Sequence, residues 1–346
     1  MQKEELKYQI EPHIYNTLKL NEYFLVTEKS SKLLSTNRLD VGFKLFFLEH
    51  FNKNRSLSRL VYFKSLKANK LFSIKEYGNK KKNSLQAFEK VFIELFDDIK
   101  KNGFDTDKSF LPLNKDKELL NGSHRLAITA FLGFDISYII TENKEFENQD
   151  YKYFFRRNIN QNLIEKAVLS FIRFSDNIHI AFIWPRANIT NSNLESKFQN
   201  ILYYKEINFN FSAAHYLISE VYSGDYWTGN YKDRFKGSIG KVKECFTSNN
   251  PLRVIYFKEQ DVKKIAHIKE SIRKECKAGK HSIHITDNKD EVDKTSKIVL
   301  NDNTIDFLNK ANILKFKENF KVISDFKIFL KENKIEFESV VVDSSF

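Results

Sequence analysis

Apolar and polar residues follow two different periods along this chain. Between Leu85 and Lys101 the apolar residues recur at every third or fourth position, which is the spacing of one face of an α-helix. Gly103 follows that stretch, at the place where helices often end. Shorter apolar runs, such as HIAFIWP and PLRVIYF, have the length and composition of buried β-strands. Because strand-like and helix-like segments alternate, the pattern predicts an α/β or α+β fold.

The stretch KELLNGSHRLAITAFLGFDISYII, residues 117–140, shows both periods in close succession. A short apolar strand is expected to end on Asn121 and Gly122, and a helix over 123–132 to follow, before ISYII returns as a strand. Packing of a core does not require a histidine and an arginine at the start of a helix, so this turn is the first candidate site. The residues that open the helix are Ser123, His124 and Arg125.

The length of 346 residues suits two domains of ordinary size. We predict an N-terminal domain at 1–150, a helical connector at 151–176 and a second domain at 177–305. Residues 306–346 remain as a C-terminal segment. Its last residues, IEFESVVVDSSF, form a strand-like run that stops as a turn begins, so the segment is read either as the end of the fold or as the start of a further, truncated domain.

The second domain is expected to alternate strands and helices from its first residues. HIAFIWP is read as a strand, ESKFQNILYY as a helix and EINFNF as a strand. Later in the domain, HSIHIT is read as a strand, and a last helix is expected over 290–300. This order again favours a mixed α and β architecture.

Composition and charge narrow the function classes. The net charge of +12 would suit a polyanion partner if it lay on one basic surface. The surplus consists of lysines spread over the chain beside abundant Asn, Ile and Phe, a pattern that codon bias alone can produce. We therefore do not expect nucleic acid as a partner.

The cysteines and the apolar runs indicate the cellular compartment of the protein. Cys245 and Cys276 are the only cysteines and lack metal-ligand spacing, which fits a reducing cytoplasm and predicts no metal site held by the protein. The first residues lack the apolar core of a secretory signal, and no apolar run approaches the ~20 residues needed to cross a bilayer. The sequence therefore predicts a cytoplasmic protein without a transmembrane segment.

The turn at Asn121 and Gly122 has two physical readings. In the first, the free N–H groups of the following helix, the Ser123 hydroxyl, the His124 imidazole and the Arg125 guanidinium converge on a phosphate. In the second, Asn-Gly is only a tight turn and Ser123 only a helix cap, with the histidine and arginine in solvent. Spacing alone leaves both readings open.

Residues from about 99 to 140 resemble the ParB and sulfiredoxin superfamily, so a domain of this kind is expected at about 40–140. Its signature is a strand, a Gly-containing turn, a small or polar residue, His-Arg or Arg-Arg, and an Ala-containing helix that ends at Gly. The superfamily includes sulfiredoxin, CTP-binding ParB proteins and free-serine kinases, and its motif binds nucleotide phosphates. The resemblance implies that ATP or another nucleoside triphosphate, accompanied by Mg²⁺, binds at Asn121, Gly122, Ser123, His124 and Arg125.

Two positions depart from the pattern of this superfamily. The kinases have an acidic residue where this chain has Asn121, and sulfiredoxin has its reactive cysteine where this chain has Ser123, which excludes sulfiredoxin chemistry. A small-molecule kinase also needs a carboxylate to orient or deprotonate the acceptor hydroxyl. Glu89 and Glu118 are the candidates, and each is also read as a solvated surface residue.

A second candidate site lies in GKHSIHITDNKDE, residues 279–291. Strict alternation places His284 on the face of the strand opposite to Ile283 and Ile285. The histidine is read either as an exposed residue on a sheet edge or as a phosphoryl acceptor. In the second reading its imidazole attacks phosphorus, and the polar groups that follow fix its tautomer.

The order of elements from about 177 to 305 resembles nucleoside diphosphate kinase. The residues that carry the resemblance are Ile183-Trp184-Pro185, Tyr222, PLRVIYFKEQ, Ile272-Arg273 and Ile283-His284-Ile285-Thr286-Asp287. The resemblance implies a ferredoxin-like βαββαβ domain, with His284 at the phosphohistidine position and a second phosphate site at Arg273 and Thr286. Trp184 stands where the family has a phosphate-binding lysine, and Ile285-Thr286 replaces Gly-Ser, so an inactive copy of the fold is an equal alternative.

Together the two resemblances predict a nucleotide-dependent phosphotransferase. It would move a phosphoryl group from a nucleoside triphosphate to a hydroxyl of a small metabolite, such as an amino acid or a sugar, in surface-polysaccharide biosynthesis by analogy. His284 and Glu89 are the expected catalytic residues. The alternatives are a ParB-like regulator whose nucleic-acid binding is switched by nucleotide, for which no helix-turn-helix is evident, and a non-catalytic nucleotide-binding scaffold.

Overall fold

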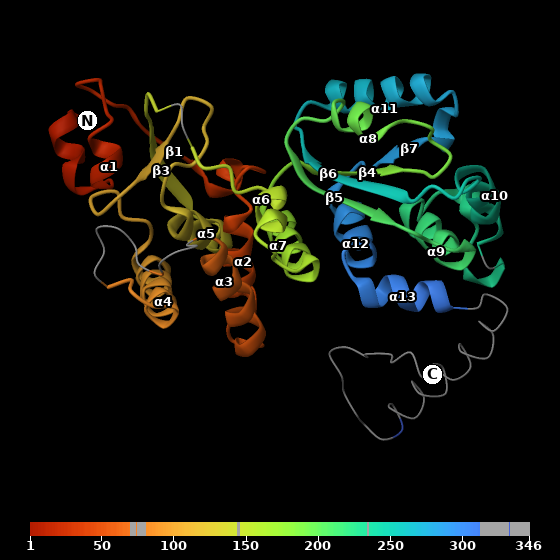
Figure 1. Cartoon of the computed structure of the whole chain (residues 1–346), viewed down its shortest axis with the longest axis horizontal. Helices are drawn as coiled ribbons and strands as arrows, with labels where there is room; N and C mark the ends of the chain where they lie inside the picture. The colour runs from red at the N-terminus through yellow and green to blue at the C-terminus, as the bar shows by residue number, and fades with distance from the viewer. Residues whose placement is uncertain (70–73, 75–80, 144–145, 234, 312–331, 333–346) are drawn as a thin grey trace.

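The computed structural model describes residues 1–69, 74, 81–143, 146–233, 235–311 and 332. Within these residues, helices are combined with two small β-sheets, so the fold is of the mixed α+β kind. Figure 1 shows two halves, each with its own sheet, and α6 and α7 between them. Of the C-terminal segment predicted at 306–346, everything after Ala311 except Glu332 lies outside the described residues.

The sheet of the N-terminal half has three strands in the order β1-β3-β2. β1 (Leu25–Lys29) pairs antiparallel with β3 (Asp135–Ile140), and β2 (Leu111–Leu113) pairs parallel with β3. The helix α5 (Ser123–Leu132) lies between β2 and β3 in the chain, as the crossover that a parallel pair requires. The first candidate site is therefore carried by the helix that joins two paired strands.

α5 packs against α2 and α4, and α3 packs against α2; Figure 1 shows these helices below the sheet. α4 spans Leu85–Asn102 and ends at Gly103, which has a φ of +80°, so the helix predicted from the apolar spacing is confirmed. Aromatic rings fill the space between the helices, among them Phe47, Tyr62 and Phe92. The remaining elements of the half are α1 (Pro12–Tyr15), α2 (Asp40–His50), α3 (Arg55–Asn69) and 3₁₀ turns at Lys3–Tyr8 and Ser30–Leu33.

The helices between the two halves belong to the core. α6 spans Tyr151–Arg156 and α7 spans Gln161–Phe174, within the stretch predicted to be a helical connector. α7 lies so close to α2 that a Cβ on Gly42 would come within 2.6 Å of the Ala167 carbonyl oxygen. A glycine at this position allows the two backbones to approach, so the connector is packed against the N-terminal half rather than extended as a linker.

The C-terminal half contains a four-stranded sheet in the order β5-β6-β4-β7, with every neighbouring pair antiparallel. Its strands are β4 (Ile178–Ile183), β5 (Ile201–Ile207), β6 (Leu252–Lys258) and β7 (Ile283–Ile285). The helix expected over ESKFQNILYY is wrong: α8 ends at Glu195, the first residue of this stretch, and β5 begins at Ile201. The β-branched and aromatic side chains there are stabilised by pairing with β6, which the local sequence does not reveal.

Helices cover both faces of this sheet (Figure 1). Ile183, Ile255 and Ile283 point to the face covered by α8 and α11, whereas Phe182 and Val254 point to the face covered by α9 and α12. The helices are α8 (Asn191–Glu195), α9 (Phe211–Val221), α10 (Lys236–Cys245), α11 (Val262–Cys276), α12 (Lys289–Val299) and α13 (Asp302–Lys310), with 3₁₀ turns at Tyr226–Thr228, Tyr231–Asp233 and Gly279–His281.

Candidate functional site

The chain reverses direction before it enters α5. The Asn114 side-chain oxygen accepts hydrogen bonds from the N–H groups of Asp116 (2.9 Å) and Glu118 (2.8 Å), and Leu119 then bridges back to Leu113 in antiparallel register. The segment expected as a strand before Asn121 is thus the short return arm of a tight turn. This turn brings the start of α5 beside the start of β2.

Gly122 is the residue on which that arrangement depends. It caps α5 with a φ of +94°, a conformation that side chains disfavour. A Cβ at this position would lie 2.4 Å from Leu111 Cδ2 and 3.0 Å from Arg125 Nη2. The Arg125 guanidinium therefore lies directly against the glycine at the helix start, and its Nη1 donates to the Phe110 carbonyl oxygen at 3.2 Å.

The first turn of α5 is open to an acceptor. Within the described residues, no side chain accepts a hydrogen bond from the N–H groups of Ser123 or His124. The Asn121 and Ser123 side chains, both partly buried, likewise have no hydrogen-bond partner within the described part of the chain. Helix N-termini of this kind attract anions, because the exposed N–H groups and the helix dipole act together.

His124 points away from this turn, toward α3 and α4. Its Nε2 is 2.8 Å from the Tyr62 hydroxyl, and its ring meets the Phe92 ring edge-on with centroids 4.7 Å apart. Burial lowers the pKa of His124 well below its usual range, and the nearby Lys44 and Lys82 lower it further. The imidazole is therefore neutral at pH 7 and held in place by its neighbours, and it does not converge with Arg125 on one spot.

A buried ionic cluster lies next to His124. The Asp40 carboxylate accepts from Arg38 Nε at 2.8 Å and from Lys44 Nζ at 2.9 Å, and all three side chains are buried. Burial alone would raise the pKa of Asp40, but the two cations hold it well below its usual range. This cluster was not predicted from the sequence, although an Asp and a Lys four residues apart in one helix were a signal for a pair.

The two candidate carboxylates near α5 already have partners. Glu89 is buried and accepts from Arg59 Nε at 2.7 Å. It lies one helical turn before Phe92, which contacts the His124 ring. Glu118 accepts from Ser35 Oγ at 2.8 Å and from Asn37 Nδ2 at 2.7 Å. Neither residue is the solvated surface group that one reading of the sequence predicted.

At the second candidate site, His284 is enclosed rather than exposed. It lies on β7 opposite Phe182 and points to the face of the sheet covered by α9 and α12. Its Nε2 contacts Glu291 on α12, and its ring meets the Tyr222 ring at a centroid distance of 4.9 Å. Glu291 also accepts from the Asp287 N–H at 2.8 Å, which fixes the carboxylate. The histidine and glutamate form a positioned pair.

Arg273 and Thr286, predicted as a second phosphate site, lie in different environments. The Thr286 hydroxyl is buried and accepts from the Ile180 N–H at 2.9 Å, at the start of β4. Arg273 donates to Glu270, one turn away on α11, at 2.7 Å. Thr286 thus stabilises the fold where it stands, whereas Arg273 makes an ion pair within its own helix and its Nε has no partner among the described residues. His284 and Glu89 belong to different halves of the molecule (Figure 1).

The described residues contain neither a metal-binding cluster nor a membrane-spanning helix. Within the described residues, no three His, Cys, Asp or Glu side chains are grouped closely enough to hold a metal ion. In the same part of the chain, no helix has both the length and the apolar character that spanning a bilayer requires. No protein-family model matches the chain, and no curated protein or solved structure matches it either.

Proposed function

We propose that this protein is a nucleotide-dependent phosphotransferase whose N-terminal half binds the phosphates of a nucleoside triphosphate at the start of α5. The observation that carries the proposal is the uncapped first turn of α5, with the Arg125 guanidinium against Gly122 beside it. The turn offers N–H groups, the Asn121 amide and the Ser123 hydroxyl, which are the donors that phosphate oxygens accept. The spacing of these residues is also that of the ParB and sulfiredoxin motif.

Mg²⁺ would accompany the nucleotide. It takes oxygen ligands and usually keeps several waters, so phosphate oxygens and water can supply most of its coordination. Asp40, whose charge acts on the pKa of His124, is held by Arg38 and Lys44 and is a poor ligand for Mg²⁺. The proposal therefore assigns the ion to the nucleotide and not to a site formed by the protein alone.

The sheet order β5-β6-β4-β7, with all neighbours antiparallel, supports a ferredoxin-like βαββαβ unit in the C-terminal half. Within it, the His284–Glu291 pair supports His284 as a phosphoryl acceptor. Because Nε2 is engaged by Glu291, the nucleophile would be Nδ1: the γ-phosphorus would bond to Nδ1 as its bond to the nucleoside diphosphate breaks. His284 and the start of α5 belong to different halves, so this step requires the bound nucleotide to be brought from one half to the other. The final acceptor would be a hydroxyl of a small metabolite.

Binding is tested by isothermal titration of the full chain with ATP, CTP and GTP in the presence of Mg²⁺. We expect one of the three to bind, and Arg125→Ala to weaken that binding at least about tenfold, as expected for loss of a charge-assisted hydrogen bond. Ser123→Ala should weaken it by a smaller factor. Arg156→Ala removes an exposed arginine of α6, between the two halves, and serves as the matched control.

Absence of binding to all three nucleotides would refute the proposal, and so would equal affinity of the wild type and a folded Arg125→Ala variant. Transfer is tested separately with γ-labelled nucleotide. An acid-labile label on the wild type that is lost in His284→Gln supports the phosphohistidine step. Nucleotide binding without any label would instead indicate a nucleotide-binding scaffold.

A further inference from the structure

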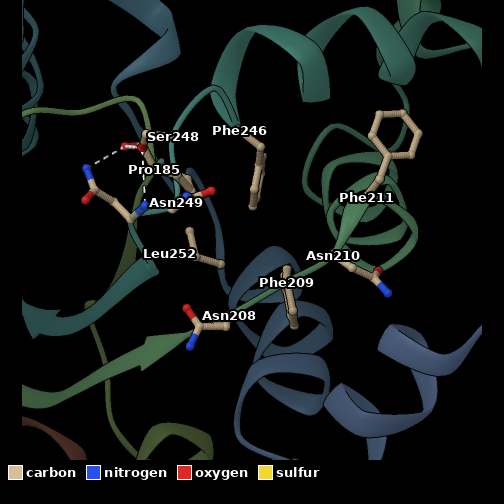
Figure 2. A pocket seen from close by; sticks show the side chains of 10 residues that line it. Pro185, Asn208, Phe209, Asn210, Phe211, Phe246, Ser248, Asn249 and Leu252 are labelled. Carbon is tan, nitrogen blue, oxygen red and sulfur yellow. Dashed lines mark hydrogen bonds between the residues drawn. The ribbon is translucent and has the colours of Figure 1, made fainter.

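A pocket of about 360 Å³ lies at one end of the C-terminal sheet, outside both sites discussed above. It opens where β4 and β5 end and β6 begins, and Figure 2 shows its wall from close by. The segments that form it are the residues after β4, the link from β5 to α9, and the link from α10 to β6. Pockets of this volume are in the range that holds small organic ligands.

The walls of the pocket are held by hydrogen bonds of their own. Ser248 Oγ donates to the Pro185 carbonyl oxygen at 2.6 Å, and Asn250 Nδ2 reaches the same oxygen at 3.3 Å. On the opposite side, the Asn210 side chain caps α9 by accepting from the Ala213 N–H at 3.0 Å. Asn309 on α13 accepts from the Asn210 N–H at 2.9 Å. The pocket is therefore built into the frame of this half.

The residues that line the pocket are uncharged. Among the described residues, none that lines the pocket carries a charge, although the chain has 57 basic and 45 acidic residues. The Asn208 and Asn249 side chains have no hydrogen-bond partner within the described structure, so each offers an N–H₂ donor and a carbonyl acceptor. Phe209 and Phe246 add apolar ring surface beside them (Figure 2).

The combination of amide groups and aromatic rings favours some classes of ligand over others. A phosphate or carboxylate would find no cation in the described lining, and a purely apolar ligand would leave the two amides without partners on burial. A neutral sugar suits both parts, because its C–H faces pack on aromatic rings while its hydroxyl groups donate to and accept from amides. We propose that this pocket binds a neutral sugar of one or two rings.

The test is ligand-detected NMR of the full chain with D-glucose, D-galactose, N-acetyl-D-glucosamine and lactose, followed by titration of any that binds. At least one sugar should bind. Asn249→Ala should weaken that binding about tenfold, because it removes one or two hydrogen bonds from an exposed position without altering the core. Asn208→Ala should have a similar effect. Asn303→Ala, an equally exposed asparagine on α13, is the matched control and should leave the affinity unchanged.

Several outcomes would overturn the sugar proposal. No binding of any sugar in the set would do so, as would binding that Asn249→Ala and Asn208→Ala leave unchanged. Binding of uncharged adenosine but of no sugar, lost in the same two variants, would assign the pocket to a nucleobase instead. Because Arg125→Ala lies in the other half, it should not affect sugar binding, so this result is independent of the nucleotide proposal.

Discussion

The start of α5 and the strand β7 both drew attention through a histidine among polar residues, but their histidines are held differently. His124 is fixed by Tyr62 and Phe92, which come from helices far away in the sequence. His284 is fixed by Glu291, only seven residues later. The comparison teaches that a helix start can be recognised from consecutive residues, whereas the role of a side chain depends on the elements that pack against it.

The largest effect is expected at the ionic cluster beside α5. Asp40→Asn removes the anion that compensates the buried Arg38 and Lys44. Loss of one partner from a buried ion pair leaves uncompensated charge, so the free energy of unfolding should fall by about 4 kcal/mol. Unfolding in urea measures the change. Asp306→Asn, an exposed aspartate on α13, should change stability by less than about 0.5 kcal/mol. Equal effects of the two would contradict the buried cluster.

The next effect should arise at the turn before α5. Gly122→Ala places a Cβ against Leu111 in a residue with positive φ, and we expect a loss of about 3 kcal/mol from strain and overlap. Gly240→Ala is the control, because a Cβ there meets no atom within 4 Å and the residue lies inside α10. Thermal unfolding compares the two. A stable Gly122→Ala protein would show that the helix start is not held as described.

A smaller effect tests whether Thr286, the residue that follows β7, has a structural role. Thr286→Val keeps the shape of the side chain but leaves the buried Ile180 N–H without its side-chain acceptor. The free energy of unfolding should fall by about 1.5 kcal/mol. His284→Gln, by contrast, should change stability less and abolish the label expected in the transfer assay. If Thr286→Val were neutral for stability and harmful only to transfer, Thr286 would belong to the site instead.

The smallest effect is expected on the pH dependence of the free energy of unfolding, through His124. The pKa of His124 is lowered in the folded protein. The contribution of the neutral His124 to the free energy of unfolding is therefore complete above pH 6.5. It is lost as the pH falls toward the folded pKa, because the unfolded chain takes up a proton before the folded protein does. Between pH 7.5 and pH 5.5 the wild type should lose about 1 kcal/mol more than His124→Gln. Urea unfolding of the two proteins at both pH values measures the difference.

Local regularities in the chain were enough for much of the fold. The three- and four-residue spacing between Leu85 and Lys101 gave α4, and Gly103 gave its end. Alternation put Ile283 and Ile285 on one face of β7 and His284 on the other. Local signals failed at Ile201, where β5 forms because β6 lies beside it. One of the two readings of His284, as an exposed residue on a sheet edge, also failed, because alternation does not show whether helices cover the second face of a sheet.

The sequence by itself determined where the candidate turn lies, because Gly122 is needed for a conformation that depends only on the local backbone. It also determined the mixed α and β class, through the helix-like and strand-like spacing of apolar residues along the chain. Only the tertiary structure decided that His124 faces Tyr62, that Asp40 is enclosed by two cations and that uncharged residues line a pocket beyond β5. These features bring together residues that are distant in the chain. Their contacts depend on how the elements pack in three dimensions, which cannot be read from the spacing of apolar residues along the sequence.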